Sequence, residues 1–285
     1  MNTFDMRRRS RRALVALLVG IAHAAVVLGV ALRYGYEVGP SAYSVEGVLW
    51  RYGGLVALGA LAAWLALELH LVVPLALVGV LAGLALHAEL TPPDLVFRDV
   101  AELEPSIDEP TGFTVVENGL YLVKYLSAWY VWTAGAALAG MWEYLVRSRR
   151  EWFPAPPQRW AVPSTVRTAV LIAAGAGAIH AAASLGFGFT RGINAPPLLW
   201  LWMGVGGILL LAVPAYLLVR HDLVTPMGVA VLMLVNSVYS QQYAGPGDPH
   251  ALYLWAWVVF LGIALLPVRN PPPPLAVIVR RFCLR

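Results

Sequence analysis

The chain has 285 residues, of which 59% are hydrophobic and 13% charged, and its formal net charge is +4. A soluble domain is about a quarter charged, so this composition excludes one. The 20 basic residues are dispersed along the chain rather than gathered in one motif, which excludes a nucleic-acid-binding protein. The single cysteine, Cys283, excludes an intramolecular disulfide and a multi-cysteine metal site.

The apolar residues fall into eight runs, most of them roughly 18–23 residues long, which is the length that crosses about 30 Å of hydrocarbon as a helix. They predict an all-α, polytopic transmembrane bundle. The expected spans are Ala13–Leu32, Val48–Leu69, Leu71–His87, Gly119–Trp142, Thr168–Gly188, Pro197–Val219, Leu223–Ser240 and Ala251–Leu266. For the second and third runs, one long broken helix is the main alternative.

The charges between the spans predict the orientation. Residues 1–12 form a basic N-terminal segment, residues 147–166 an Arg/Pro-rich linker and residues 269–285 a Pro/Arg-rich tail, and the positive-inside rule places all three in the cytoplasm. Residues 89–117 carry eight of the sixteen acids and are expected to form an acidic extracytoplasmic loop. The chain is therefore expected in the cytoplasmic membrane, with both termini in the cytoplasm.

The sequence also contains an internal duplication. A shift of 157 places lays Gly20–Ala25 on Gly177–Ala182, with His23 on His180. Weaker matches relate Leu49-Trp50 to Leu199-Trp200, His70 to His221, Pro74 to Pro226 and Leu120–Leu122 to Leu252–Leu254. These matches predict two four-helix repeats, residues 13–146 and 167–268, inserted the same way round.

His23 and His180 fall near the centres of the first and fifth spans. Ionisable groups at that depth need a partner or a wet cavity, so both are candidates for a ligand or proton site. Three interpretations stay open: hydrogen bonding across a small-residue helix interface, a proton or substrate role, and axial ligation of one shared haem. The cofactor stays unknown: haem is the candidate, and His23 and His180 are metal ligands only if haem is bound.

Arg51 and Lys124 lie a few residues inside the outer ends of the second and fourth spans, where the matched residues Leu201 and Ala256 are apolar. Either side chain reaches headgroups by snorkelling, or both form a cationic ledge. Tyr121, Lys124, Tyr125 and Trp129 recur at helical spacing and would provide aromatic walls for an anionic or lipid-like ligand; an interfacial aromatic belt is the alternative.

The remaining histidines are expected near the ends of the spans: His70 and His221 at cytoplasmic turns, and His87 and His250 toward the outer surface. No phosphate-loop lysine, ordered Ser-His-Asp set or His-Glu-x-x-His motif is present, so no catalytic residue is predicted.

Three functions are consistent with these features. The first is the handling of a small solute, an ion or a lipid at the interface of the two repeats. The second is a haem-binding membrane redox protein that uses His23 and His180. The third is a non-catalytic membrane scaffold that docks partners through its acidic loop or its proline-rich segments.

Overall fold

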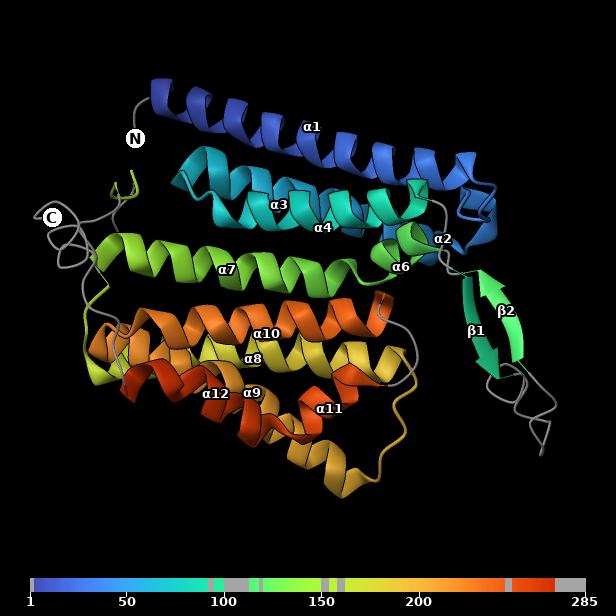
Figure 1. Ribbon diagram of the computed structural model, residues 1–285. Helices are drawn as coiled ribbons and strands as arrows, with labels where there is room; N and C mark the ends of the chain where they lie inside the picture. Colours follow the sequence, from blue (N-terminus) through green and yellow to red (C-terminus); the bar gives the residue numbers. More distant parts are fainter. Residues whose placement is uncertain are drawn as a thin grey trace, which may run out of the picture.

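A computed structural model describes residues 3–91, 95–99, 113–117, 120–149, 154–157, 162–243 and 248–269. These residues form a helical bundle with one short two-stranded ribbon (Figure 1). The first half contains α1 (Thr3–Arg33), α2 (Val45–Val48), α3 (Gly54–Leu69), α4 (Val73–Leu90), α6 (Tyr121–Ser127) and α7 (Trp129–Arg149). The second half contains α8 (Val166–Thr190), α9 (Pro197–His221), α10 (Val224–Tyr243), α11 (Pro249–Trp255) and α12 (Trp257–Arg269).

Six of the described helical segments are long and apolar enough to cross a membrane, and a seventh is reached if α11 and α12 count as one bent span. The six are Arg9–Arg33, Val45–Leu69, Val73–Leu90, Val166–Thr190, Pro197–His221 and Val224–Tyr243. The second of these combines α2, a π-helical turn over Leu49–Gly53 and α3. The chain is therefore a multi-pass membrane protein, while eight crossings and the 4+4 repeat stay predictions.

Helix α7 occupies the centre of the bundle and is not among those six. It packs against α3 and α4 on one side and against α8 and α10 on the other (Figure 1). Its buried residues include Trp132 and the small residues Gly135, Ala136, Ala139 and Gly140. Small residues allow close helix approach, and a helix that faces protein on all sides needs less apolar surface than one that faces lipid.

The predicted fourth and eighth spans are both broken helices. The break between α6 and α7 is at Ala128, and the break between α11 and α12 is at Ala256, where the two axes differ by 80°. Neither Gly nor Pro stands at these positions, which is why the sequence predicts continuous helices there.

The second and third spans form two separate helices, so the alternative of one long broken helix is wrong. Helix α3 ends at His70, which adopts a left-handed conformation with φ of 56°. Helix α9 ends in the same way at Asp222, with φ of 54°. The residue that corresponds to His70 is therefore Asp222, one place away from the expected His221.

The ribbon departs from the all-α prediction. Strand β1 (Leu95–Asp99) pairs antiparallel with β2 (Phe113–Glu117), from Leu95 opposite Glu117 to Asp99 opposite Phe113. Both segments are rich in β-branched and aromatic residues, a strand signal that the nearby acids obscure in the sequence. Residues 92–94, 100–112 and 118–119, with most of the predicted loop's acids, lie outside the described residues.

Glu89 does not belong to a solvated loop as expected, because it lies in the last turn of α4 and is 8% exposed. Its Oε2 accepts a hydrogen bond from the Leu122 backbone N–H at 2.9 Å, and Tyr36 donates its hydroxyl to Oε1. The backbone donors at a helix start need acceptors, so Glu89 fixes the first turn of α6.

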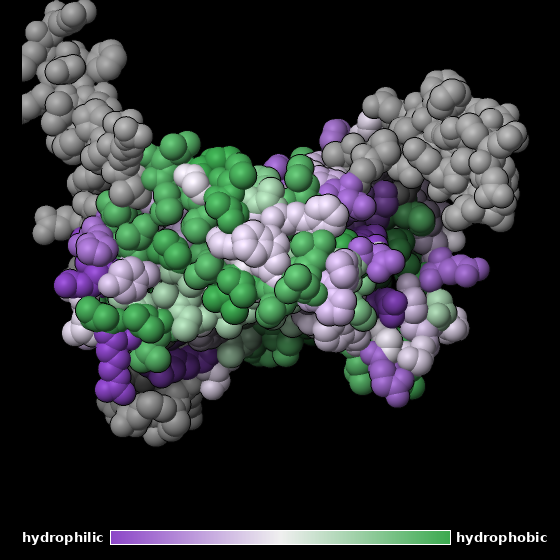
Figure 2. Space-filling view, turned by 90° about the horizontal axis from the view of Figure 1, so that it is seen from below, coloured by the Kyte–Doolittle hydropathy of each residue, from purple (hydrophilic) through white to green (hydrophobic). Residues whose placement is uncertain are grey.

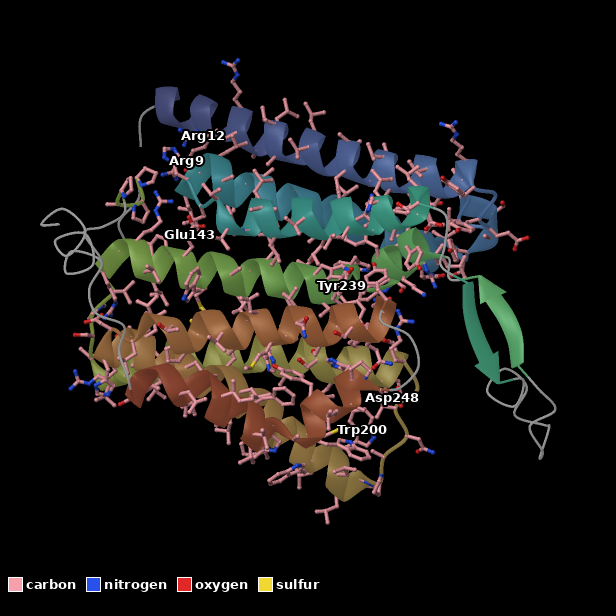
Figure 3. The ribbon with its side chains drawn as sticks, viewed as in Figure 1. Arg9, Arg12, Glu143, Trp200, Tyr239 and Asp248 are labelled. Atoms are coloured by element: carbon pink, nitrogen blue, oxygen red, sulfur yellow. The ribbon has the colours of Figure 1, made fainter. Side chains whose placement is uncertain are left out.

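Basic residues gather at the end of the bundle opposite the ribbon; this end is called the inner end, and the ribbon end the outer end. Figure 3 shows Arg9, Arg12 and Glu143 at the inner end. Arg12 Nη1 lies 3.0 Å from Glu68 Oε2. On the face seen in Figure 2, hydrophobic residues cover the middle and hydrophilic residues lie toward both ends. Residues 150–153, 158–161 and 270–285, parts of the predicted cytoplasmic segments, lie outside the described residues.

Candidate functional site

His23 joins three elements of the first half. Its Nδ1 lies 3.0 Å from the Leu55 carbonyl oxygen on α3, and its Nε2 lies 3.0 Å from the Tyr125 hydroxyl on α6. A carbonyl only accepts, so Nδ1 carries the proton, and in the neutral ring Nε2 accepts from Tyr125. Tyr125 is fully buried rather than part of an exposed aromatic face.

His180 makes the same two contacts in the second half. Its Nδ1 donates to the Gly207 carbonyl oxygen on α9, and its Nε2 lies 2.8 Å from the Tyr253 hydroxyl on α11. The His180 and Tyr253 side chains are buried. Each histidine therefore ties the first helix of its half to the second helix and to the short segment of the broken helix.

Further contacts recur at equivalent positions in the two halves. Gly54 lies against the Trp129 indole, and Gly206 lies against the Trp257 indole; in both, an added Cβ would come within 2.2 Å of the ring. The ring centroids of Trp50 and Trp129 are 4.7 Å apart, and those of Trp202 and Trp257 are 4.9 Å apart. Gln241 Oε1 accepts from the His250 N–H as Glu89 accepts from Leu122. Equivalent residues of the two halves are 152 positions apart in the second and third helices and 128 positions apart in the broken fourth helix.

No family model, curated protein or solved structure matches this chain. The function must therefore be argued from the arrangement of its own side chains.

The two histidines do not fit a shared haem. His23 lies between α1, α3 and α6, whereas His180 lies between α8, α9 and α11, with α7 between these groups in the bundle (Figure 1). Both nitrogens of each ring already have hydrogen-bond partners, so an iron would have to displace a tyrosine hydroxyl from Nε2. Among the described residues, no group of three or more His, Cys, Asp or Glu side chains is arranged to hold a metal ion.

The second half contains an additional buried polar network. His250, expected near the surface, is fully buried, and its Nε2 donates to the Ser184 carbonyl oxygen at 2.9 Å. Its Nδ1 lies 3.1 Å from the Ser237 hydroxyl, and the Ser184 hydroxyl lies 3.4 Å from His180 Nε2. The network therefore connects the middle of α8 with the outer ends of α10 and α11.

Arg51 and Lys124 each lie over a tyrosine of their own segment. The Arg51 guanidinium carbon is 4.2 Å from the Tyr43 ring centroid, and Lys124 Nζ is 5.2 Å from that of Tyr121. The structurally equivalent residues are Met203 and Leu252, not the expected Leu201 and Ala256. Both cations lie toward the ribbon end of the bundle, and cation–π contact accounts for their orientation.

A third outer cation, Arg191, was not identified from the sequence. It directly follows α8 and lies exposed at the interface of the two halves, where it contacts α6 and α10. Its Nη2 donates to Gln242 Oε1 on α10 and lies 3.4 Å from the Ser127 hydroxyl on α6. Partial desolvation lowers the pKa of the Arg191 guanidinium below its usual value, because desolvation disfavours the charged form.

The side chains that Arg191 contacts by hydrogen bonds are polar but uncharged. None of the ion pairs formed within the described part of the chain includes Arg191. Gln242 is 3% exposed, and its Nε2 has no hydrogen-bond partner among the described residues. The Tyr130 hydroxyl lies 2.8 Å from Thr190 Oγ1 beside it. We call Ser127, Tyr130, Thr190, Arg191 and Gln242 the Arg191 cluster.

Tyr121, from the predicted aromatic wall, and Tyr243, which was not predicted, connect Lys124 with this cluster. The Tyr121 and Tyr243 ring centroids are 5.7 Å apart, and Tyr243 donates its hydroxyl to the Tyr121 carbonyl oxygen at 3.3 Å. Tyr243 directly follows Gln242. One signal in the sequence points to Arg191: it stands at the end of a predicted span, next to Gly192, in a connection with no acidic residue.

Proposed function

We propose that this protein binds a small anionic group at the outer end of the interface between two four-helix units. The observation that carries the proposal is the Gln242 amide, buried beside the Arg191 guanidinium with its Nε2 donors unused. An unsatisfied buried donor costs about 1–3 kcal/mol. A phosphate or carboxylate oxygen bound by Arg191 would accept from both groups once the buried Gln242 amide turns toward it, and this would remove that cost.

The architecture in this proposal is eight crossings in two parallel units. It is supported by the repeated His–Tyr contacts, the Gly–Trp contacts and the matching breaks at Ala128 and Ala256. In it α7 crosses as the long part of the fourth span, shielded from lipid by its neighbours. Parallel repeats place equivalent elements around an axis along the membrane normal, with binding regions where the repeats meet. The Arg191 cluster has members from both units.

The orientation in this proposal has the inner end in the cytoplasm. Arg9, Arg12, Arg147 and Arg149 lie at the inner end and favour it, because basic residues are retained on the cytoplasmic side. The anion site then faces the extracytoplasmic side of the cytoplasmic membrane.

The candidate residues have different roles in this proposal. Arg191 and Gln242 bind the anion. Lys124 lies over Tyr121, whose ring packs against Tyr243 beside the cluster, and its charge raises the positive potential at the site. His23 and His180 are positioning residues: with Tyr125 and Tyr253 they hold the short helices of the broken spans, and α6 carries Ser127 and Lys124. Arg51, whose guanidinium lies over Tyr43, adds to the positive potential of the outer end without touching the ligand.

Calorimetric titration of the purified full chain in detergent with sn-glycerol 3-phosphate tests the proposal. The expected result is saturable binding that Arg191→Gln weakens by about tenfold to a hundredfold, because a hydrogen bond to a charged group contributes about 1.5–3 kcal/mol. Gln242→Met keeps the side-chain volume, removes the amide donors and weakens binding as well.

The matched control is Arg33→Gln, which removes an exposed outer-end cation away from the cluster and leaves the affinity unchanged. Absence of binding to the wild-type chain, or equal binding by Arg191→Gln, contradicts the proposal. Thermal unfolding of each variant checks that the fold is intact.

A further inference from the structure

Two cavities adjoin at the outer end of the second half, and Arg191 lines one of them. The first has a volume of about 550 Å³ and lies between the α8–α9 connection and α11; Arg191, Asn194, Asp248 and Trp255 are among its lining residues. The second has a volume of about 560 Å³ and is lined by Pro196, Leu198, Leu199, Leu201, Trp202 and Val205. Trp202 Nε1 donates to the Trp255 carbonyl oxygen at 3.0 Å, so the two cavities meet at these tryptophans.

The first cavity carries one charge of each sign. Arg191 comes from the connection after α8, and Asp248 from the residue before α11. No ion pair joins these two described residues, although both line the same cavity. Asp248 is exposed and accepts one hydrogen bond, from Gln241 Nε2 at 3.1 Å. A ligand that carries a phosphate and an amine would satisfy both charges at once.

The second cavity is a groove made of apolar side chains. Leu198 and Leu201 are 78% and 64% exposed, so the groove opens on the lipid-facing surface of α9. From Leu198 to Val205 the helix descends about 10 Å, from the interface into the hydrocarbon region. Figure 3 shows Trp200, at the start of α9, and Asp248, before α11, toward the same end of the second half.

We propose that these cavities together bind one phospholipid with an ethanolamine headgroup, an inference that rests on the proposed anion site. The phosphate binds Arg191, the ammonium group binds Asp248, and one acyl chain follows the groove of α9 past Trp202. A tryptophan at the junction of a polar and an apolar cavity matches the depth at which its ring is most stable. A free phosphate ester fills the first cavity only and leaves the groove to bulk lipid.

A second copy of this chain is a less suitable occupant of the groove. Helix–helix contacts in membranes favour small residues that let the backbones approach, whereas this groove is lined by large side chains. The unpaired Arg191 and Asp248 beside it also call for a ligand with both charges at one end and an apolar chain at the other.

Native mass spectrometry of the full chain tests this inference. The purified protein is delipidated in detergent and given an equimolar mixture of palmitoyl-oleoyl phosphatidylethanolamine and phosphatidylglycerol. One ethanolamine lipid per chain is expected to be retained in preference, about tenfold over the glycerol lipid. Asp248→Asn should abolish that preference, and Arg191→Gln should reduce the retention of both lipids about tenfold or more.

A groove-filling variant separates this inference from the proposed anion site. Val205→Trp places a large side chain in the groove and should abolish lipid retention while sn-glycerol 3-phosphate still binds. Leu171→Trp is the matched control, because Leu171 is 63% exposed on α8 and does not line the groove. It should retain the lipid as the wild type does.

Three outcomes overturn the inference: no retained lipid, equal retention of the two lipids, or retention that Arg191→Gln and Val205→Trp both leave unchanged. If glycerol phosphate binds and the lipid does not, the anion site stands and the lipid assignment fails. If neither binds, both fail.

Discussion

Gly206→Ala provides a sharp test of the packing at the broken eighth span. An alanine Cβ at this position would lie 2.2 Å from Cγ and Cδ1 of Trp257, whereas ordinary contacts begin at 3.4 Å. The rigid indole would have to move by about 1.2 Å, and it is 8% exposed and packed against Trp202. Overpacking of this kind costs about 1–3 kcal/mol, and a clash with a rigid ring belongs at the upper end.

The same substitution also raises helix propensity by about 1 kcal/mol, which opposes the clash. Gly175→Ala is the control, because an added Cβ there meets nothing within 4 Å. We expect Gly206→Ala to lower the free energy of unfolding by about 2 kcal/mol and Gly175→Ala to raise it by up to about 1 kcal/mol. The two variants should therefore differ in free energy of unfolding by about 3 kcal/mol. Because both gain the same helix propensity, this difference measures the clash alone.

Denaturation of the purified chain in mixed micelles, followed by tryptophan fluorescence, measures both variants. Gly54→Ala should behave like Gly206→Ala, since its Cβ would lie 2.2 Å from the Trp129 ring. Equal stabilities of Gly206→Ala and Gly175→Ala would refute the close Gly–Trp contact, and with it the reasoning about the broken span.

Three further predictions concern buried polar contacts. A double-mutant cycle of His180→Leu and Tyr253→Phe should give a coupling free energy of about 0.6–2 kcal/mol, measured by the same unfolding assay. Glu143→Ala should lower the free energy of unfolding by about 1–3 kcal/mol, because Glu143 accepts hydrogen bonds from the first N–H groups of α4 and pairs with Arg147. Burial and the hydrogen bond to Glu89 raise the pKa of Tyr36 above 10.0, so the unfolded chain ionises first and stability falls as pH rises above about 10.

Each of these predictions has its own control. A coupling near zero would mean that the His180–Tyr253 contact is absent. Glu46 is exposed near the start of α2, and Glu46→Ala should have no measurable effect. Tyr36→Phe should flatten the alkaline part of the stability profile, whereas Tyr34→Phe should not, and an unchanged slope in Tyr36→Phe would contradict the assignment.

Hydropathy located the membrane helices well because the bilayer imposes one length and one composition on every lipid-facing helix. It did not find the breaks at Ala128 and Ala256, where the chain is as apolar as in a continuous helix and only tertiary contacts fix the bend. The ribbon was missed for a different reason: the acidic residues of its loop suggested a solvated segment, while its strands are five residues each.

The site was only partly predictable. His23 and His180 were found because a titratable group in an apolar run stands out in any sequence. Their partners were not, because Tyr125 is 102 residues from His23 and the interface that joins them is formed by folding. Arg191 looked like an ordinary residue at the end of a span, and its importance comes from Gln242, 51 residues later.

The buried network around His250 has a consequence for how this sequence can change. Where the second half has His250, Ser184 and Ser237, the equivalent positions of the first half are Leu122, Val27 and Ala85, all buried. If the histidine were introduced into the first half earlier than the equivalent of Ser237, its imidazole would lack one hydrogen-bond partner in a dry interior. A serine introduced first can bond its own helix backbone, as Ser237 bonds the Leu234 carbonyl oxygen. An evolutionary path from the apolar to the polar set is therefore ordered, with Ala85→Ser before Leu122→His, and a laboratory conversion of the first half should succeed only in that sequence.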